Sequence, residues 1–66
     1  MFDKKTALYE KCLKDVATEY RTTWYDIVDT DDFEIVLERI AKALNAHPGY
    51  IWQDKHFQSW YRGIVS

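Results

Sequence analysis

The chain has 66 residues, a single cysteine and a formal net charge of −2. This length allows one domain at most, and a lone cysteine excludes an internal disulfide. No stretch approaches the roughly 18 apolar residues of a membrane span, and residues 1–20 lack the apolar core of a signal peptide. We therefore expect a single cytoplasmic domain over residues 1–66 that makes no contact with a membrane.

The charges are segregated along the chain. Residues 39–66 carry four basic side chains and one acidic one. Residues 22–38 carry no basic side chain and six acidic ones, which are Asp26, Asp29, Asp31, Asp32, Glu34 and Glu38. We therefore expect one acidic side and one mildly basic side on the folded molecule.

The first predicted helix covers residues 4–20, with Asp3 as its N-cap. Its apolar residues recur every three or four positions and form one stripe, made of Leu8, Tyr9, Cys12, Leu13, Val16, Ala17 and Tyr20. This spacing is typical of a helix that buries one face. Cys12 lies on that stripe, so we interpret it as a small core residue and not as a reactive thiol.

Residues 22–29 fit a short helix over 24–28. Thr22 and Thr23 are β-branched and weaken continuation of the first helix. Thr23 can cap a new helix that has Asp26 in its first turn. A strand is the alternative, but a single strand has no partner for its backbone groups.

The clearest predicted helix covers residues 31–45. Its apolar positions follow helical spacing without interruption: Phe33, Val36, Leu37, Ile40, Ala41 and Leu44. Thr30 or Asp31 is the expected N-cap, and Asp31 and Glu34 have the spacing of a capping box. Asn45 fits the end of the helix, and Pro48-Gly49 is expected to stop the chain and turn it.

A last helix is predicted over residues 53–62. Phe57, Trp60, Tyr61 and Ile64 are spaced for one face, and Gly63 is the expected terminator. The predicted fold is thus all-α, a small bundle of three main helices plus a short helix at 24–28.

No pattern predicts catalysis, a cofactor or a metal. The sequence lacks a nucleophile elbow, a glycine-rich phosphate loop and a zinc-protease motif. His47 and His56 have no cysteine near them, and His47 is best interpreted as a turn or cap residue. The acidic run lacks the alternating oxygen ligands and the glycine of a calcium loop. We therefore predict a protein that is not an enzyme.

The leading functional hypothesis is a protein-interaction module, an inhibitor or regulator of the kind found on phage or mobile elements. Aromatic anchors in a charged surround are typical of interface hot spots. The predicted contacts to a basic partner protein are Asp29, Asp31, Asp32, Glu34, Glu38, Trp24, Tyr25, Tyr50 and Trp52. A homodimer is a variant of this hypothesis, because pairing would hide surplus aromatic surface. The alternative interpretation of the acids is helix capping and a solvated surface.

A second hypothesis comes from the segment Ile40-Ala-Lys-Ala-Leu-Asn-Ala-His-Pro-Gly-Tyr-Ile51. It resembles the helix-turn-helix of phage-repressor-like regulators. The resemblance implies a DNA-binding regulator that uses residues 40–62, with Gln53, Lys55 and Arg62 facing nucleic acid. The sequence departs from the family where Asp54 replaces an apolar residue.

A third pattern concerns the order of the acids and the turn that follows them. Asp31, Asp32, Glu34 and Glu38 precede His47-Pro48-Gly49-Tyr50. This order is similar to that of the acidic immunity proteins, which neutralise bacterial nuclease toxins. The resemblance implies inhibition of a partner protein as one use of such an acidic surface.

Overall fold

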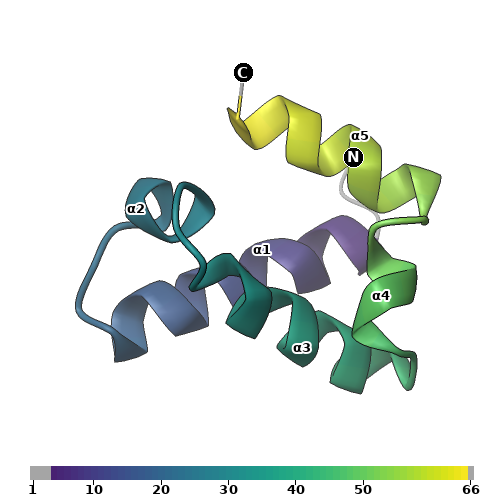
Figure 1. Ribbon diagram of the computed structural model, residues 1–66, viewed down its shortest axis with the longest axis horizontal. Helices are drawn as coiled ribbons and strands as arrows, with labels where there is room; N and C mark the ends of the chain where they lie inside the picture. The colour runs from purple at the N-terminus through teal and green to yellow at the C-terminus, as the bar shows by residue number, and fades with distance from the viewer. Residues whose placement is uncertain (1–3, 66) are drawn as a thin grey trace.

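The computed structural model describes residues 4–65, and within this range the chain forms helices and no strands. The helices in chain order are α1 (Lys4–Glu19), α2 (Trp24–Val28), α3 (Phe33–Leu44), α4 (Pro48–Ile51) and α5 (Lys55–Val65) (Figure 1). The predicted all-α class with three main helices is confirmed. The predicted cap Asp3 lies outside the described residues.

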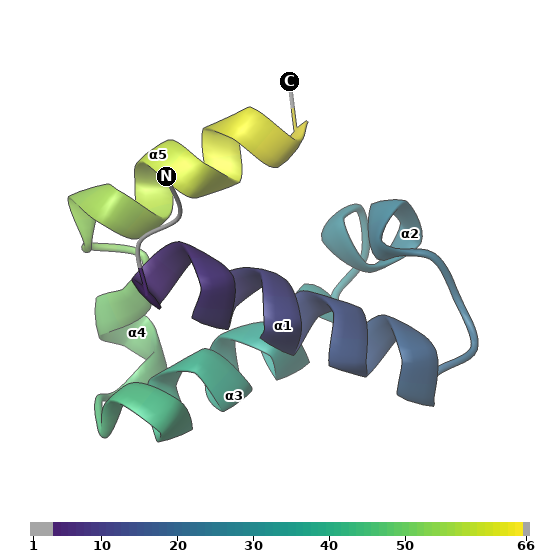
Figure 2. The same ribbon diagram turned by 180° about the vertical axis from the view of Figure 1, so that it is seen from behind.

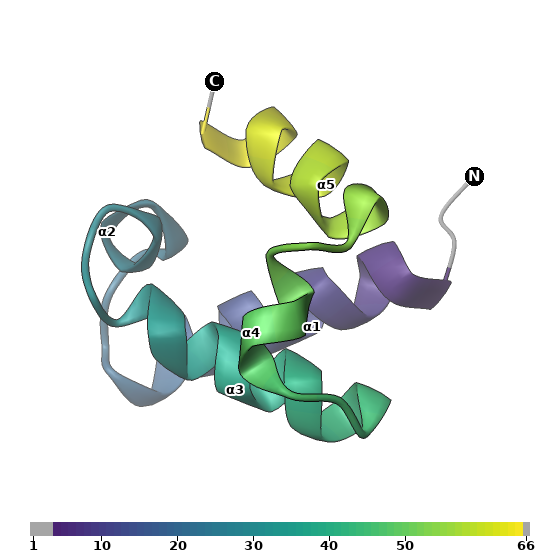
Figure 3. The same ribbon diagram turned by 45° about the vertical axis from the view of Figure 1, so that its right-hand side comes forward.

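Helices α1 and α3 lie side by side and form the base of the molecule (Figure 1). Seen from behind, α2 and α5 both lie on the upper side of α1, toward its two ends (Figure 2). The short helix α4 links the end of α3 to the start of α5 (Figure 3). The chain thus folds back over its own first helix.

Every helix contributes to one core. Its largest fully buried side chains come from α1, α2, α3 and α5, and they are Tyr9, Val16, Ile27, Val36, Ile40 and Phe57. Helix α4 adds the buried Ile51. The predicted apolar stripes of residues 4–20 and 31–45 supply most of this core, as their spacing requires. Cys12 is buried as predicted, and burial raises the pKa of its thiol, with a smaller contribution from Asp15.

Aromatic rings fasten α5 to the other helices. The Phe57 ring lies 5.3 Å from the Tyr9 ring on α1 and 5.3 Å from the Trp52 ring, centroid to centroid, both edge to face. Phe33 on α3 lies 5.3 Å from the Tyr61 ring. Such pairs add about 0.5–1.5 kcal/mol each beyond the area they bury.

Helix α1 ends at Glu19, one residue before the predicted end. Arg21 adopts a left-handed backbone with φ 53°, and the Thr22 amide donates to the Ala17 carbonyl at 2.9 Å. This arrangement is a Schellman-type helix end, which satisfies carbonyls of the last turn. Tyr20 therefore leaves the apolar stripe, and half of its surface is exposed.

Helix α2 has the predicted bounds. Thr23 is its N-cap, and its hydroxyl accepts a hydrogen bond from the Asp26 amide at 3.4 Å. The buried side chain of Ile27 anchors this single turn to the core. The strand alternative is therefore wrong.

Helix α3 begins at Phe33, and the predicted capping box of Asp31 and Glu34 is wrong. The Thr30 hydroxyl accepts from the Asp32 amide at 3.3 Å, and the Glu34 amide donates to the Asp31 carbonyl at 3.1 Å. Asp32 occupies the N-cap position without a side-chain cap hydrogen bond. A main-chain turn thus uses the Glu34 amide that the Asp31 carboxylate was expected to bind.

The predicted end of α3 at Asn45 is confirmed, with φ 55° at that residue. The expected stop at Pro48-Gly49 is wrong, because Pro48 begins α4. The fixed φ of proline suits the first helical position, where no amide donor is needed. His47 caps this turn: its Nδ1 accepts from the Gly49 amide at 3.0 Å.

Helix α5 differs from its predicted bounds at both ends. It begins at Lys55 and not at Gln53, because the Asp54 carboxylate accepts from the His56 amide at 2.9 Å and caps the first turn. It continues through Gly63 to Val65. Ile64 packs against the core, so its burial favours one more turn of helix over termination at the glycine.

One ion pair connects α1 to α3. The Arg39 guanidinium donates two hydrogen bonds to the Glu19 carboxylate, one of them 2.6 Å from Nη2 to Oε1. This hydrogen bond to Arg39 lowers the pKa of Glu19 below its usual value. The pair joins the C-terminal end of α1 to the middle of α3.

We expect Phe57→Ala to lower the free energy of unfolding by about 3–5 kcal/mol, because it leaves a cavity among the rings of α1, α3 and α4. Ile40→Val, in the same core, should cost only about 0.5–1.5 kcal/mol. Urea denaturation followed by circular dichroism measures both. A loss below about 1 kcal/mol for Phe57→Ala would contradict the role of this ring.

We expect Glu19→Gln to lower the thermal midpoint at neutral pH. Because the folded-state pKa of Glu19 is depressed, its stabilising effect is present above the unfolded-state pKa and is lost as the pH falls through the folded-state pKa. The melting curves of the wild type and the variant should therefore converge at acidic pH. A difference that stays constant from neutral to strongly acidic pH would show that Glu19 acts through another contact.

Candidate functional site

Helix α3 has two distinct faces. Its inward face carries the buried Phe33, Val36, Leu37, Ile40 and Ala41. Glu34 and Glu38 lie one turn apart on the exposed side, and Asp31 lies in the turn before the helix. Residues four apart are neighbours on a helix surface. The exposed side of α3 therefore begins with a row of two carboxylates.

A groove runs beside this row of carboxylates, between α3 and α4. Its volume is about 300 Å³, and we call it the acidic groove. Helix α3 contributes one wall and α4 with its C-cap the other, so that the lining residues are Glu34, Leu37, Glu38, Pro48, Gly49 and Trp52. The groove thus combines two carboxylates, an indole ring and an apolar floor.

The Trp52 ring is fixed although 42% of the residue is exposed. It makes edge-to-face contacts with Phe57 at 5.3 Å and with Tyr61 at 5.1 Å, and a tilted contact with Phe33 at 5.9 Å. Its carbonyl accepts a hydrogen bond from Gln58 Nε2 at 2.7 Å. A partner would therefore meet an indole that is already held in place, which reduces the entropy lost on binding.

The cap of α4 fixes the far wall of the groove. The His47 ring packs edge to face against Tyr50 at 5.9 Å, and Tyr50 is 64% exposed. A Cβ added at Gly49 would lie 3.2 Å from His47 Nδ1. Glycine therefore permits the close approach that the cap requires.

The acids of this face form no ion pair within residues 4–65. Among residues 4–65, the ion pairs join Lys5 to Asp54 and Arg39 to Glu19, so that none includes an acid of residues 22–38. The Asp26 carboxylate accepts from the hydroxyls of Thr22 and Thr23 at 3.2 Å. In the part of the chain that the structure describes, no group of three or more His, Cys, Asp or Glu side chains could hold a metal ion.

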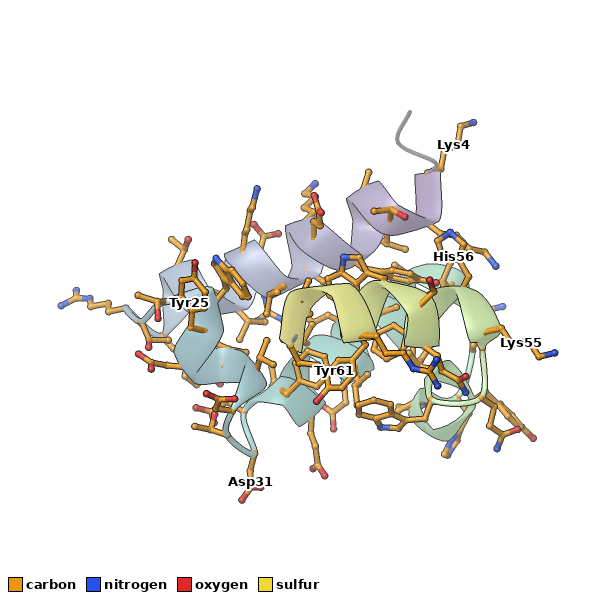
Figure 4. The ribbon with its side chains drawn as sticks, turned by 90° about the horizontal axis from the view of Figure 1, so that it is seen from above. Lys4, Tyr25, Asp31, Lys55, His56 and Tyr61 are labelled. Atoms are coloured by element: carbon orange, nitrogen blue, oxygen red, sulfur yellow. The ribbon has the colours of Figure 1, made fainter. Side chains whose placement is uncertain are left out.

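The remaining predicted acids lie at the junction between α2 and α3. Asp29 is the exposed C-cap of α2, Asp31 is exposed in the following turn, and Asp32 is half-buried as the N-cap of α3. In Figure 4, Asp31 lies well apart from Lys4 and Lys55, which are the first residues of α1 and α5. The acids of the α2–α3 junction are therefore remote from those two basic residues.

The predicted anchors Trp24 and Tyr25 do not line the acidic groove. Their rings stack with centroids 3.8 Å apart, and Tyr25 is 62% exposed. Trp24 instead lines a separate cleft between α1, α2 and α5. The structure thus divides the predicted contact residues between two surfaces.

The residues predicted for DNA contact lie near the start of α5 and on its outer side. Gln53, Lys55 and Arg62 are all exposed, and Lys55 and Arg62 are seven residues apart on one helix. The helix that begins at Pro48 ends at Ile51, and a new helix begins at Lys55. The two helices are interrupted where Asp54 departs from the helix-turn-helix pattern.

Three groove residues were not predicted from the sequence. Leu37 was assigned only to the core, and Pro48 and Gly49 only to a turn. Proline is typical of the first position of a helix, and His47, the residue before Pro48, can act as a cap. This pair is the signal that could have indicated α4. The groove itself depends on the packing of α4 against α3, which no local pattern specifies.

Comparisons of the chain with protein-family models, with curated proteins and with solved structures found no match.

Asp54 offers a test of the break between α4 and α5. Asp54→Ala should lower the free energy of unfolding by about 0.5–2 kcal/mol, because the cap of α5 is lost. Asp54→Asn keeps an oxygen acceptor and should cost clearly less, although it removes the ion pair with Lys5, whose Nζ lies 3.7 Å from Oδ2. Urea denaturation measures both variants. Equal losses would assign the effect to the charge and not to the cap.

Proposed function

We propose that this protein is a small, non-enzymatic protein-interaction module that acts in the cytoplasm as an inhibitor or regulator. Its binding surface is the acidic groove between α3 and α4, and its partner is a protein with an exposed basic segment. The observation that carries the proposal is the presence of Glu34, Glu38 and the ring of Trp52 around one groove.

Charge supports a basic partner. The two groove carboxylates have no ion-pair partner among residues 4–65, and the neighbouring Asp29 and Asp31 extend the negative potential toward α2. A face of one sign accelerates encounter with a partner of the opposite sign and disfavours like-charged proteins. Lysine or arginine side chains would therefore be drawn to this face first.

The indole supports a cationic side chain in the groove itself. A lysine or arginine over the face of a tryptophan gains about 0.5–2 kcal/mol, more as water is excluded. The apolar floor at Leu37 can accept the aliphatic stem of such a side chain. The groove thus offers a separate contact to each part of one long basic residue.

DNA binding remains the alternative proposal, through Gln53, Lys55 and Arg62. A DNA-binding surface needs a basic footprint, and its affinity falls steeply with salt. The exposed Lys55 and Arg62 share a helix, but Asp54 stands beside them. The acidic groove has a larger set of matched features, so protein binding takes precedence.

The proposal is tested by affinity capture from a lysate of the source cells, with and without nuclease, followed by mass spectrometry. We expect a basic protein that persists after nuclease treatment. Glu38→Lys should reduce its capture about tenfold, which corresponds to about 1.4 kcal/mol. Asp15→Lys makes the same change of charge on α1, outside the groove, and should leave capture unchanged.

Two results would overturn the proposal. Loss of every captured partner on nuclease treatment would favour nucleic acid. Equal capture by Glu38→Lys and Asp15→Lys would show that the groove is not the binding surface.

A further inference from the structure

The cap of α4 contains a group that can change its charge. His47 is the N-cap, and its Nδ1 accepts a hydrogen bond from the Gly49 amide at 3.0 Å. A neutral imidazole has one acceptor nitrogen, whereas both nitrogens of the protonated ring are donors. The hydrogen bond from the Gly49 amide therefore forms only while Nδ1 carries no proton.

The first turn of α4 depends on His47 for two of its hydrogen bonds. Besides the bond to the ring, the His47 carbonyl accepts from the Tyr50 amide at 2.9 Å. Pro48, at the first helical position, has no amide to donate. A helix of four residues closes few hydrogen bonds, so the loss of one of them weakens a large part of the turn.

This turn is also a wall of the acidic groove. Pro48 and Gly49 line the groove, and so does Trp52, the C-cap of α4. A Cβ at Gly49 would lie only 3.2 Å from His47 Nδ1, so the imidazole lies directly against this wall. Loss of the cap therefore leaves the wall less firmly held.

Protonation of His47 also adds a positive charge beside the groove. The charged and titratable side chains on the neighbouring elements are Glu34, Glu38 and Lys42 on α3, Tyr50 on α4 and Asp54 after α4. The Tyr50 ring packs on the imidazole, and within residues 4–65 no ion pair includes His47. Glu34 and Glu38 would attract an imidazolium, and they are the same carboxylates that attract a cation of the partner. Both consequences of protonation therefore oppose the binding of a basic partner.

We infer that His47 makes the acidic groove sensitive to pH: the groove binds its basic partner while the imidazole is neutral and releases it when the imidazole is protonated. Histidine is the side chain whose charge ordinarily changes between about pH 5 and pH 8. A basic partner should therefore bind more tightly at about pH 7.5 than at about pH 5.5. The release of the partner rests on the proposed function of the groove, whereas the opening of the cap does not.

Exchange of the Gly49 amide with water, measured by NMR on the free protein, tests the cap. His47→Asn keeps a side-chain oxygen that can cap the helix but cannot titrate. At the higher pH, the Gly49 amides of the wild type and H47N should exchange at similar rates. At the lower pH, this amide should exchange about fivefold faster in the wild type than in H47N, as expected for the loss of a cap. Each comparison is made at one pH, so the intrinsic pH dependence of amide exchange cancels.

Binding of an oligolysine peptide, measured by isothermal titration calorimetry, tests the consequence for the groove. Lysine stays protonated at both pH values, so any pH dependence of binding arises from this protein. The wild type should bind the peptide about fivefold more weakly at the lower pH. For H47N, the affinities at the two pH values should be nearly equal.

Two further variants serve as matched controls. His56, on α5, is the other histidine of the chain. His56→Gln removes its change of charge and should keep the wild-type pH dependence in both experiments. His47→Ala has no cap acceptor at either pH, so it should bind oligolysine more weakly than H47N at both. Circular dichroism should show wild-type helix content for all three variants.

The two experiments separate failure of this inference from failure of the proposed function. Equal exchange of the Gly49 amide in the wild type and H47N at the lower pH would overturn the inference, and so would the same pH dependence of binding in both proteins. Failure of oligolysine to bind at the higher pH, where the cap is intact, would overturn the proposed function and with it the release of a partner. The exchange rates of Gly49 would then still show that the cap responds to pH.

Discussion

The packing of the Phe57 ring is the interaction on which the rest of the structure depends. Phe57 is fully buried and lies within 6.3 Å, centroid to centroid, of rings from α1, α3 and the end of α4. A domain of about 60 residues buries too little surface to be strongly stable, so a few large contacts carry most of its cohesion. The lone cysteine cannot provide a cross-link in their place.

Two of the rings that pack on Phe57 also border the two surface hollows. Trp52 contacts Phe57 from one side and borders the acidic groove on the other, so one ring serves both stability and the surface. Trp60 has the same double position, since it packs on Phe57 and lines the cleft between α1, α2 and α5. In so small a protein, a residue that anchors the core is seldom more than one side chain away from solvent. A substitution of Trp52 or Trp60 is therefore also a perturbation of the fold.

Sequence patterns predicted the helices and helix ends that depend only on residues close together in the chain. The apolar spacing from Phe33 to Leu44 identified α3, and the caps Thr23 and Asn45 placed two helix ends correctly. The errors lie where tertiary packing or main-chain turns override a side-chain preference. Ile64 packs on the core and extends α5 past Gly63, and the Glu34 amide donates to the Asp31 carbonyl and not to the Asp31 carboxylate.

The candidate surfaces were predicted less completely than the helices. The sequence indicated Glu34, Glu38 and Trp52, but it also grouped Trp24 and Tyr25 with them, although these lie on a different face. Residue type and charge can indicate from the sequence which residues contact a partner. Which of them share a surface depends on how α2, α4 and α5 pack around α1 and α3, and no spacing along the chain contains that information.

The positions of the three tryptophans have a practical consequence. Trp52 borders the acidic groove, Trp24 and Trp60 border the cleft between α1, α2 and α5, and the three differ in their aromatic neighbours. Indole emission shifts in wavelength and intensity with the polarity around the ring. A form of the protein that retains only Trp52, and another that retains only Trp24, would each act as an optical reporter for one surface. Occupancy of the two faces could then be followed separately in solution, without an attached dye.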